Sequence, residues 1–152
     1  MEAEFEALKS LLDDNNMPYK VLTHEKVFTS EEAARTRGVP LSSGVKAMVV
    51  KADDFYMVLV PGDRKIDFSA LPGKAALAAP DDVLRITNCE PGSVHPFGNL
   101  FGLRVFMDRR ILDNKTVNFN AGLHEISINM DPRDLVEIIK PDIGDYSLPK
   151  RV

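Results

Sequence analysis

Two apolar segments near the middle of the chain constrain its fold more than any other feature. Residues 45–50 read VKAMVV, residues 55–60 read FYMVLV, and only four residues separate them. Short runs of this kind, rich in β-branched and aromatic residues, are typical of strands joined as a hairpin. Because neither run alternates regularly with polar residues, we expect both faces of the hairpin to be buried.

Helices are expected at four places where apolar spacing coincides with capping residues. Residues 67–80 are expected to form two short helical turns, interrupted at Pro72 and Gly73. The four predicted helices are residues 3–15; residues 29–38, with Thr29 or Ser30 as the N-cap, Glu32 completing a capping box and Gly38 as the stop; residues 80–87, with Pro80 or Asp81 near the cap; and residues 131–140, with Asp131 as the cap and Pro132 at the first helical position.

Further strands are expected at residues 19–24, 103–108, 116–121 and 125–130, the last of which alternates strictly between apolar and polar residues. Short loops, and only some helices, join these strands, which favours a mixed, largely antiparallel sheet with helices packed around it. We therefore predict an α/β chain of the α+β type, with one domain over residues 1–152. The sequence contains no glycine-rich phosphate loop and no dinucleotide-binding fingerprint.

The charge and cysteine content exclude several functional classes. A net charge of −4 argues against a general nucleic-acid or DNA binder, although a local basic patch would form if the fold brought six dispersed residues together: Arg64, Lys65, Arg104, Arg109, Arg110 and Lys115. The sequence has no apolar run long enough to span a membrane and no signal peptide at its start. With Cys89 as the one cysteine, an internal disulfide is excluded, and a cytoplasmic protein is expected.

Residues 90–102, EPGSVHPFGNLFG, form a loop of unusual composition, with three glycines, two prolines and almost no charge. Glycine and proline restrict or extend the backbone angles, so this loop is expected to hold a fixed shape. Its exposed amides would suit a carbonyl, a carboxylate or a developing oxyanion. The alternative is a wide structural turn packed by Phe97 and Phe101.

Two side chains near strand ends are candidates for chemistry. Lys46 shares a strand face with Met48 and Val50, where a lysine must either reach a polar site or extend to water. His124 follows Gly122 and has the same parity as the inward positions of the strand that begins after it. The alternative for His124 is a histidine at the edge of the core with an ordinary hydrogen-bond partner.

A thiol nucleophile and a metal site have weaker support. Cys89, with His95 or His124 as the base, would make a thiol hydrolase, but single cysteines of this kind are more often inert packing residues. The three histidines are far apart in the sequence and no paired-cysteine or H-E-x-x-H spacing occurs, so no metal is expected.

Five segments in a fixed order carry a resemblance to a known family over about residues 18–140. In this order and spacing the chain resembles the YbaK/ProX family of aminoacyl-tRNA editing domains, which also occur as insertions in bacterial prolyl-tRNA synthetases. The segments are HEKVFTSEEAARTRGVP (24–40), VKAMVVK (45–51), LVPGDRKID (59–67), EPGSVHPFG (90–98) and NAGLHEISI (120–128).

The resemblance implies a mixed, barrel-like sheet with surrounding helices, and hydrolysis of the ester between a wrong amino acid and tRNA. It implies no metal, no cofactor and no protein nucleophile; the terminal ribose of the substrate would help to activate the water. It assigns catalytic positions to Lys46, Gly92 and His124. It assigns substrate-binding positions to Phe28, Thr29, Ala47, Met48, Ser93, Val94, His95, Pro96, Phe97, Gly98 and Gly122.

The residue after the strand lysine departs from the family pattern. It is often threonine in cysteine-specific members and asparagine in alanine-specific ones, whereas here it is Ala47. A small apolar residue leaves room for alanine, serine, threonine or cysteine, and one methyl or hydroxyl changes discrimination by only ~1–3 kcal/mol. The predicted partners are the acceptor end of an aminoacyl-tRNA, with tRNA(Pro) the first candidate, and prolyl-tRNA synthetase. The alternative is a non-catalytic module of the same fold that binds an aminoacyl ligand.

Overall fold

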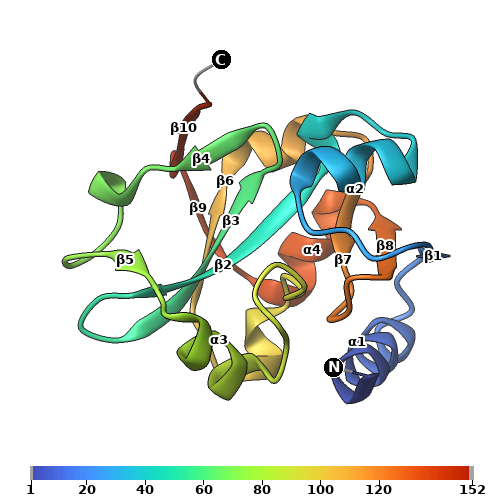
Figure 1. Ribbon diagram of the computed structural model, residues 1–152, viewed down its shortest axis with the longest axis horizontal. Coiled ribbons are helices and arrows are strands. Elements are labelled where there is room, and N and C mark those ends of the chain that lie inside the picture. The colour runs from blue at the N-terminus through green and yellow to red at the C-terminus, as the bar shows by residue number, and fades with distance from the viewer. Residues whose placement is uncertain (1, 151–152) are drawn as a thin grey trace.

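The structure is a computed structural model that describes residues 2–150. Its largest sheet has the strand order β5-β2-β3-β6-β9, and Figure 1 shows the long β2–β3 hairpin crossing the molecule. β2 (Val45–Lys51) and β3 (Phe55–Pro61) are antiparallel, as the two apolar segments predict. β6 (Val105–Asp108) runs parallel to β3, and β9 (Asp142–Gly144) runs parallel to β6.

Two smaller sheets complete the strand arrangement. One is three-stranded and antiparallel, in the order β1-β8-β7, with β1 at Tyr19–Thr23, β8 at Ile126–Met130 and β7 at Val117–Asn120. The other pairs β4 (Arg64–Ile66) with β10 (Ser147–Pro149). The expected mixed, largely antiparallel arrangement is confirmed, but these three sheets do not close into a barrel.

The helices lie around the sheets where their capping residues predict them. They are α1 (Glu2–Asp14), α2 (Ser30–Arg37), α3 (Pro80–Thr87) and α4 (Pro132–Ile139). The Thr29 hydroxyl accepts a hydrogen bond from the Glu32 amide, Gly38 ends α2 with φ of +69°, and the Asp131 carboxylate caps α4. In Figure 1, α2 lies at the top of the molecule near β7, while α1 and α3 lie at the bottom.

The hairpin is buried on both faces, as predicted. Met57 and Leu59 belong to the main core, which also receives α1, α4, β6, β7 and β8. Val58 and Val60, on the opposite face of β3, belong to a second cluster together with Phe106. This double burial explains why the sequence of β3 contains no alternating polar residues.

Two regions differ from the prediction. Residues 67–80 contain one 3₁₀ turn (Phe68–Ala70), but the second predicted turn is wrong, because Ala76–Leu77 form β5 and pair with the edge of β2. The segment from Pro141 carries no strong sequence signal, yet it forms β9 and β10. Both cases are strands of two or three residues, which are stabilised by the neighbouring strand rather than by their own composition.

Candidate functional site

A cavity of about 330 Å³ lies where α2, β2, the loop after α3 and the C-terminal tail meet. Its volume is at the lower end of the range for small-ligand sites. Seven residues of the predicted site line it: Phe28, Thr29, Lys46, Ala47, Met48, Gly92 and Val94. Further lining residues, which the sequence did not single out, include Glu31, Arg37, Asn120 and Lys150.

Lys46 enters this cavity from the start of β2. Its ammonium donates a hydrogen bond to the main-chain oxygen of Arg64, at 2.5 Å. Burial, followed by the nearby charge of Lys150, lowers the pKa of Lys46 to about 8, although Glu31 opposes the shift. The lysine therefore keeps most of its positive charge at neutral pH and is held by a neutral acceptor instead of a carboxylate.

Arg37, the last residue of α2, contributes a second cation to the cavity wall. Its Nε donates to Ser127 Oγ at 2.9 Å, and its Nη2 donates to Asn120 Oδ1 at 3.1 Å. Burial lowers the pKa of Arg37 to about 10, so the guanidinium stays charged at neutral pH. The sequence shows Arg37 only as a basic residue in the last turn of a helix, which explains why it is not recognised as a site residue.

The loop of residues 90–98 is held in place by bonds to the turn between β7 and β8. Asn120 Nδ2 donates to the main-chain oxygen of Gly92 at 2.6 Å, and the Gly122 amide donates to that of Ser93 at 3.0 Å. Gly92 and Gly122 have φ values of +87° and +92°, which glycine adopts without strain. Within residues 2–150, the amides of Gly92 and Val94 donate to no protein acceptor, so both remain available to a ligand.

His124 lies behind the mouth of the cavity and not on its surface. The imidazole is buried, with Nδ1 at 3.0 Å from the Val27 main-chain oxygen and Nε2 at 3.1 Å from Glu90 Oε2. Its ring centroid lies 4.6 Å from that of Phe28, a cavity residue with a 63% exposed side chain. His124 therefore supports Phe28 and the loop, and its role in catalysis stays a prediction.

The remaining predicted loop residues also lie outside the cavity wall. They are buried and pack into the core, where the ring of Phe97 contacts that of Phe119, and Gly98 leaves no room for a Cβ atom beside Val105. Six predicted residues are therefore not among those that line the cavity with Lys46: Ser93, His95, Pro96, Phe97, Gly98 and Gly122. Their assignment to substrate binding stays a prediction.

Cys89 does not have the environment of a nucleophile. Its side chain is fully buried, and its sulfur lies 3.4 Å from the main-chain oxygen of Thr87. Burial raises the pKa of the thiol to about 11, so little thiolate forms at neutral pH. The structure thus favours the interpretation of Cys89 as a packing residue.

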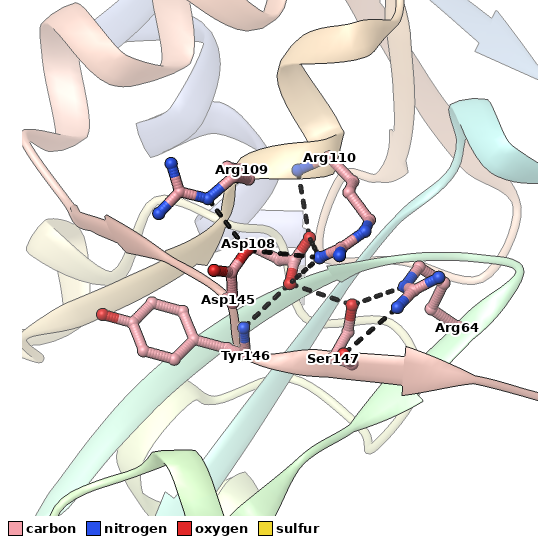
Figure 2. Close-up of polar contacts among 7 residues, drawn as sticks. All are labelled: Arg64, Asp108, Arg109, Arg110, Asp145, Tyr146 and Ser147. Atoms are coloured by element: carbon pink, nitrogen blue, oxygen red, sulfur yellow. Dashed lines mark hydrogen bonds and ion pairs between the residues drawn. The ribbon is translucent and has the colours of Figure 1, made fainter.

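The C-terminal tail contributes Lys150 to the wall of the cavity. Lys150 lines the cavity and donates to the main-chain oxygen of Gly62 at 2.8 Å, with Glu31 Oε1 at 3.3 Å. The tail is fixed at the fully buried carboxylate of Asp108, which accepts hydrogen bonds from the Tyr146 amide and Ser147 Oγ, both at 2.9 Å (Figure 2). Ser147 Oγ in turn accepts a hydrogen bond from Arg64 Nε at 2.7 Å.

Three of the six dispersed basic residues are paired with carboxylates. Arg104 pairs with Asp142. Arg109 pairs with Asp145, and Arg110 contacts the carboxylates of Asp108 and Asp145 (Figure 2). These arginines neutralise acidic groups of the tail. The cations that face the candidate site are instead Arg37, Lys46 and Lys150.

Two features are absent from residues 2–150 and bear on other functional classes. No cluster of three or more His, Cys, Asp or Glu side chains in this part of the chain is arranged to hold a metal ion. None of its helices has the length and apolar character needed to cross a membrane.

Comparison with known proteins identifies the family. Residues 24–138 match the model of the aminoacyl-tRNA editing domain. The chain belongs to this family. The match covers the cavity residues from Phe28 to Asn120, whereas Lys150 lies beyond it.

Several relatives of this editing domain have names that state a function. A "Multifunctional Ser/Thr-tRNA deacylase ProXp-y" of Escherichia coli (strain K12) is 27% identical over 150 residues, covering 91% of this chain and 90% of the relative. A "Proline--tRNA ligase" of Thermosipho melanesiensis is 28% identical over 132 residues, which is 80% of this chain but 23% of that longer protein. The crystal structure of a candidate trans-editing enzyme for prolyl-tRNA synthetase superposes with a TM-score of 0.82 at 21% identity, covering 95% of this chain and 97% of the other, and shows the shared fold.

Proposed function

We propose that this chain hydrolyses the ester of a mischarged aminoacyl-tRNA that carries a small amino acid, with serine and threonine as the first candidates. The observation that carries the proposal is the meeting of Lys46, the free amides of Gly92 and Val94, and exposed Phe28 around one cavity. Support for serine and threonine comes from the Ser/Thr-tRNA deacylase of Escherichia coli that this chain resembles and from the small side chain of Ala47 on the cavity wall.

Catalysis at this site would depend on positioning and on stabilisation of charge. The amides of Gly92 and Val94 supply donors for the ester carbonyl, in a loop that the hydrogen bonds from Asn120 and Gly122 hold in place. Lys46 provides a positive charge for the oxygens of the terminal nucleotide. The exposed ring of Phe28, supported by His124, offers a stacking surface for its base.

The water oxygen adds to the ester carbonyl carbon, and the bond from this carbon to the ribose oxygen then breaks. The leaving oxygen of the ribose takes up the proton that the water loses, so tRNA and the free amino acid are the products. A ribose hydroxyl of the substrate can relay this proton from the water to the leaving oxygen.

The first test is a deacylation panel with tRNA(Pro) charged separately with alanine, cysteine, serine, threonine and proline, and with serine and threonine on a second tRNA. We expect rapid loss of the serine and threonine esters, no loss of the proline ester, and a fall of at least ~100-fold in the Lys46→Ala variant. Lys51→Ala, at the exposed end of the same strand, is the matched control and should resemble the wild type.

Two results would point to other functions. If the wild type hydrolyses no ester but binds a non-hydrolysable aminoacyl-adenosine analogue with saturation, the chain is a binding module. If Cys89→Ser abolishes hydrolysis while the protein stays folded, the reaction uses a thiol nucleophile. Adding prolyl-tRNA synthetase to the panel tests whether that enzyme is a partner, which would appear as faster hydrolysis at limiting tRNA.

A further inference from the structure

Arg37 is a partly buried cation whose protein contacts are all to neutral groups. Its two hydrogen-bond acceptors are Ser127 Oγ and Asn120 Oδ1, and no carboxylate in residues 2–150 forms an ion pair with it. Ser127 also contacts His24 Nε2 at 2.7 Å, while His24 Nδ1 lies 2.6 Å from the main-chain oxygen of Glu25. None of these contacting groups is a carboxylate, so none of them balances the charge of Arg37.

A buried charge without a counter-charge lowers stability unless a ligand supplies one. A role confined to the helix dipole does not require this burial, because Arg35, in the same last turn of α2, serves the dipole from an exposed position. The burial of Arg37 therefore calls for an explanation within the cavity that it lines.

The donors that remain on Arg37 are placed for such a ligand. Nε and Nη2 are fixed by Ser127 and Asn120, whereas Nη1 donates to no acceptor within residues 2–150. Nη1 lies above the backbone of Gly44, another cavity residue: a Cβ atom at Gly44 would be 3.9 Å from it. A side chain at Gly44 would thus narrow the space in front of the guanidinium.

Asn120 connects Arg37 to the loop that contacts the ester in the proposed function. Its Oδ1 accepts from Arg37, and its Nδ2 donates to the main-chain oxygen of Gly92 at 2.6 Å. One amide side chain therefore sets the distance between a guanidinium and a loop glycine whose own amide is free. Such a fixed arrangement of donors is what a developing oxyanion requires.

We propose that Arg37 is a further catalytic residue of this site, which binds the ester carbonyl oxygen as negative charge develops on it during attack by water. The inference rests on the proposed function and deepens it. As the water oxygen bonds to the carbonyl carbon, the π electrons of the carbonyl move to its oxygen, and the Nη1 protons of Arg37 together with the loop amides stabilise that charge. When the bond to ribose breaks, the charge returns and the contact weakens.

The kinetic test compares the full-length wild type with Arg37→Met, Arg37→Lys and Arg35→Met in single-turnover hydrolysis of serine and threonine esters of tRNA. Removing one oxyanion donor lowers the rate constant of hydrolysis by roughly 10²–10³-fold. We expect this loss in Arg37→Met at saturating enzyme. The enzyme concentration that gives half-saturation should change by less than about threefold. Arg37→Lys should recover part of the rate, and Arg35→Met should match the wild type. The proposal would be overturned if Arg37→Met kept the wild-type rate constant at saturating enzyme, whether or not the enzyme concentration at half-saturation rose.

A binding test gives a readout that does not need turnover. Two seryl-adenosine analogues are compared by calorimetry: an amide, which imitates the ground state, and a phosphonate, which carries the negative charge of the intermediate. We expect the wild type to bind the phosphonate more tightly than the amide. In Arg37→Met the ratio of the two dissociation constants should fall at least tenfold, while the dissociation constant of the amide changes by less than threefold. A preference that is unchanged in Arg37→Met would overturn the role of Arg37.

The two tests separate failure of the inference from failure of the proposed function. If the wild type hydrolyses the esters and the phosphonate preference is independent of Arg37, only the inference fails. If the wild type hydrolyses none, the proposed function fails, and the phosphonate result still decides whether Arg37 binds an oxyanion. Should Arg37→Met unfold, Arg37→Gln, which retains a neutral donor, replaces it, with its thermal transition checked against that of Arg35→Met.

Discussion

The loop of residues 90–98 and the tail of residues 142–150 both contribute to the cavity, but they are held by different means. The loop is fixed by its own backbone: Gly92 has a positive φ, and main-chain groups bond to the β7–β8 turn. The tail is fixed by one buried carboxylate, Asp108, which binds the Tyr146 amide and the Ser147 hydroxyl (Figure 2). Backbone restraints thus hold one wall of the site, whereas the other wall combines short strand pairings with a buried carboxylate that binds two consecutive tail residues.

The difference has an energetic consequence. Burial would raise the pKa of Asp108, but hydrogen bonds from the Arg110 and Tyr146 amides and from Ser147, together with the charge of Arg110, outweigh burial and lower it. The folded state therefore needs the ionised form of this carboxylate. Losing it removes the acceptor of both Tyr146 and Ser147 at once, whereas losing one loop restraint leaves the others in place.

The largest expected effect comes from Asp108→Ala, which removes the anchor of the tail. Four donor groups lose their acceptor, and breaking a buried charged network of this kind lowers the free energy of unfolding by about 3–5 kcal/mol. Chemical denaturation measures the change. Asp142→Ala, which removes an exposed ion pair with Arg104, is the control and should cost at most about 1 kcal/mol.

A loss below about 1 kcal/mol in Asp108→Ala would show that the tail is held mainly by its strand pairing. The contrast between the two walls of the site would then disappear.

Acid should destabilise the loop before it affects the anchor of the tail. His95 is fully buried, with Nδ1 accepting the Phe97 amide, and burial lowers its pKa from 6.5 to about 3. The neutral imidazole is favoured in the fold, so its contribution is complete above pH 6.5 and is lost as pH falls toward 3. Over this window the free energy of unfolding should fall by up to ~1.4 kcal/mol per pH unit.

The measurement is the denaturation midpoint of wild type and His95→Gln as a function of pH. The variant keeps an acceptor but does not titrate, so its slope between pH 6.5 and about 4 should be shallower. Asp108 has a lowered pKa, so its contribution to stability is lost only below the ordinary pKa value of 3.8. Equal slopes in both proteins would mean that His95 is not the group that takes up the proton.

The smallest effect on stability, with a clear effect on activity, is expected for Gly92→Ala. An added Cβ atom would meet only His124 Cε1, at 3.6 Å, so the cost is the positive φ of +87°, worth about 1–2 kcal/mol. Relief of that strain would move the free amide of Gly92 and slow ester hydrolysis.

Gly102→Ala is the matched control, because Gly102 has φ of +70° with nothing near its added Cβ atom and does not line the cavity. It should lose similar stability and keep full activity. Equal activity losses in the two variants would show that the loop contributes through stability alone.

The sequence predicts those parts of the site that depend on backbone type. The residue type alone predicts the capping roles of Thr29 and Gly38 and the positive φ angles of Gly92 and Gly122. The two apolar runs likewise predict the hairpin. Arg37 and Lys150 could not be predicted, because their roles depend on partners far away in the chain: Ser127 for the first, Gly62 for the second.

Burial explains the remaining differences. The loop motif is visible in the sequence, but only the fold shows that Gly92 and Val94 face the cavity while Phe97 packs into the core. Strands of two or three residues, such as β5 and β10, carry too few side chains for a periodic signal.

The parallel pairing of β3 with β6 also bears on the order in which the molecule assembles. β2 and β3 are close in sequence and can pair early, whereas β6 joins β3 only after residues 62–104, which include the loop, have been folded back across the sheet. Contacts between distant segments form slowly because closing a long chain segment costs entropy. In refolding, the spectroscopic signal of the hairpin should therefore return first, and a working site would be among the last properties that the protein regains.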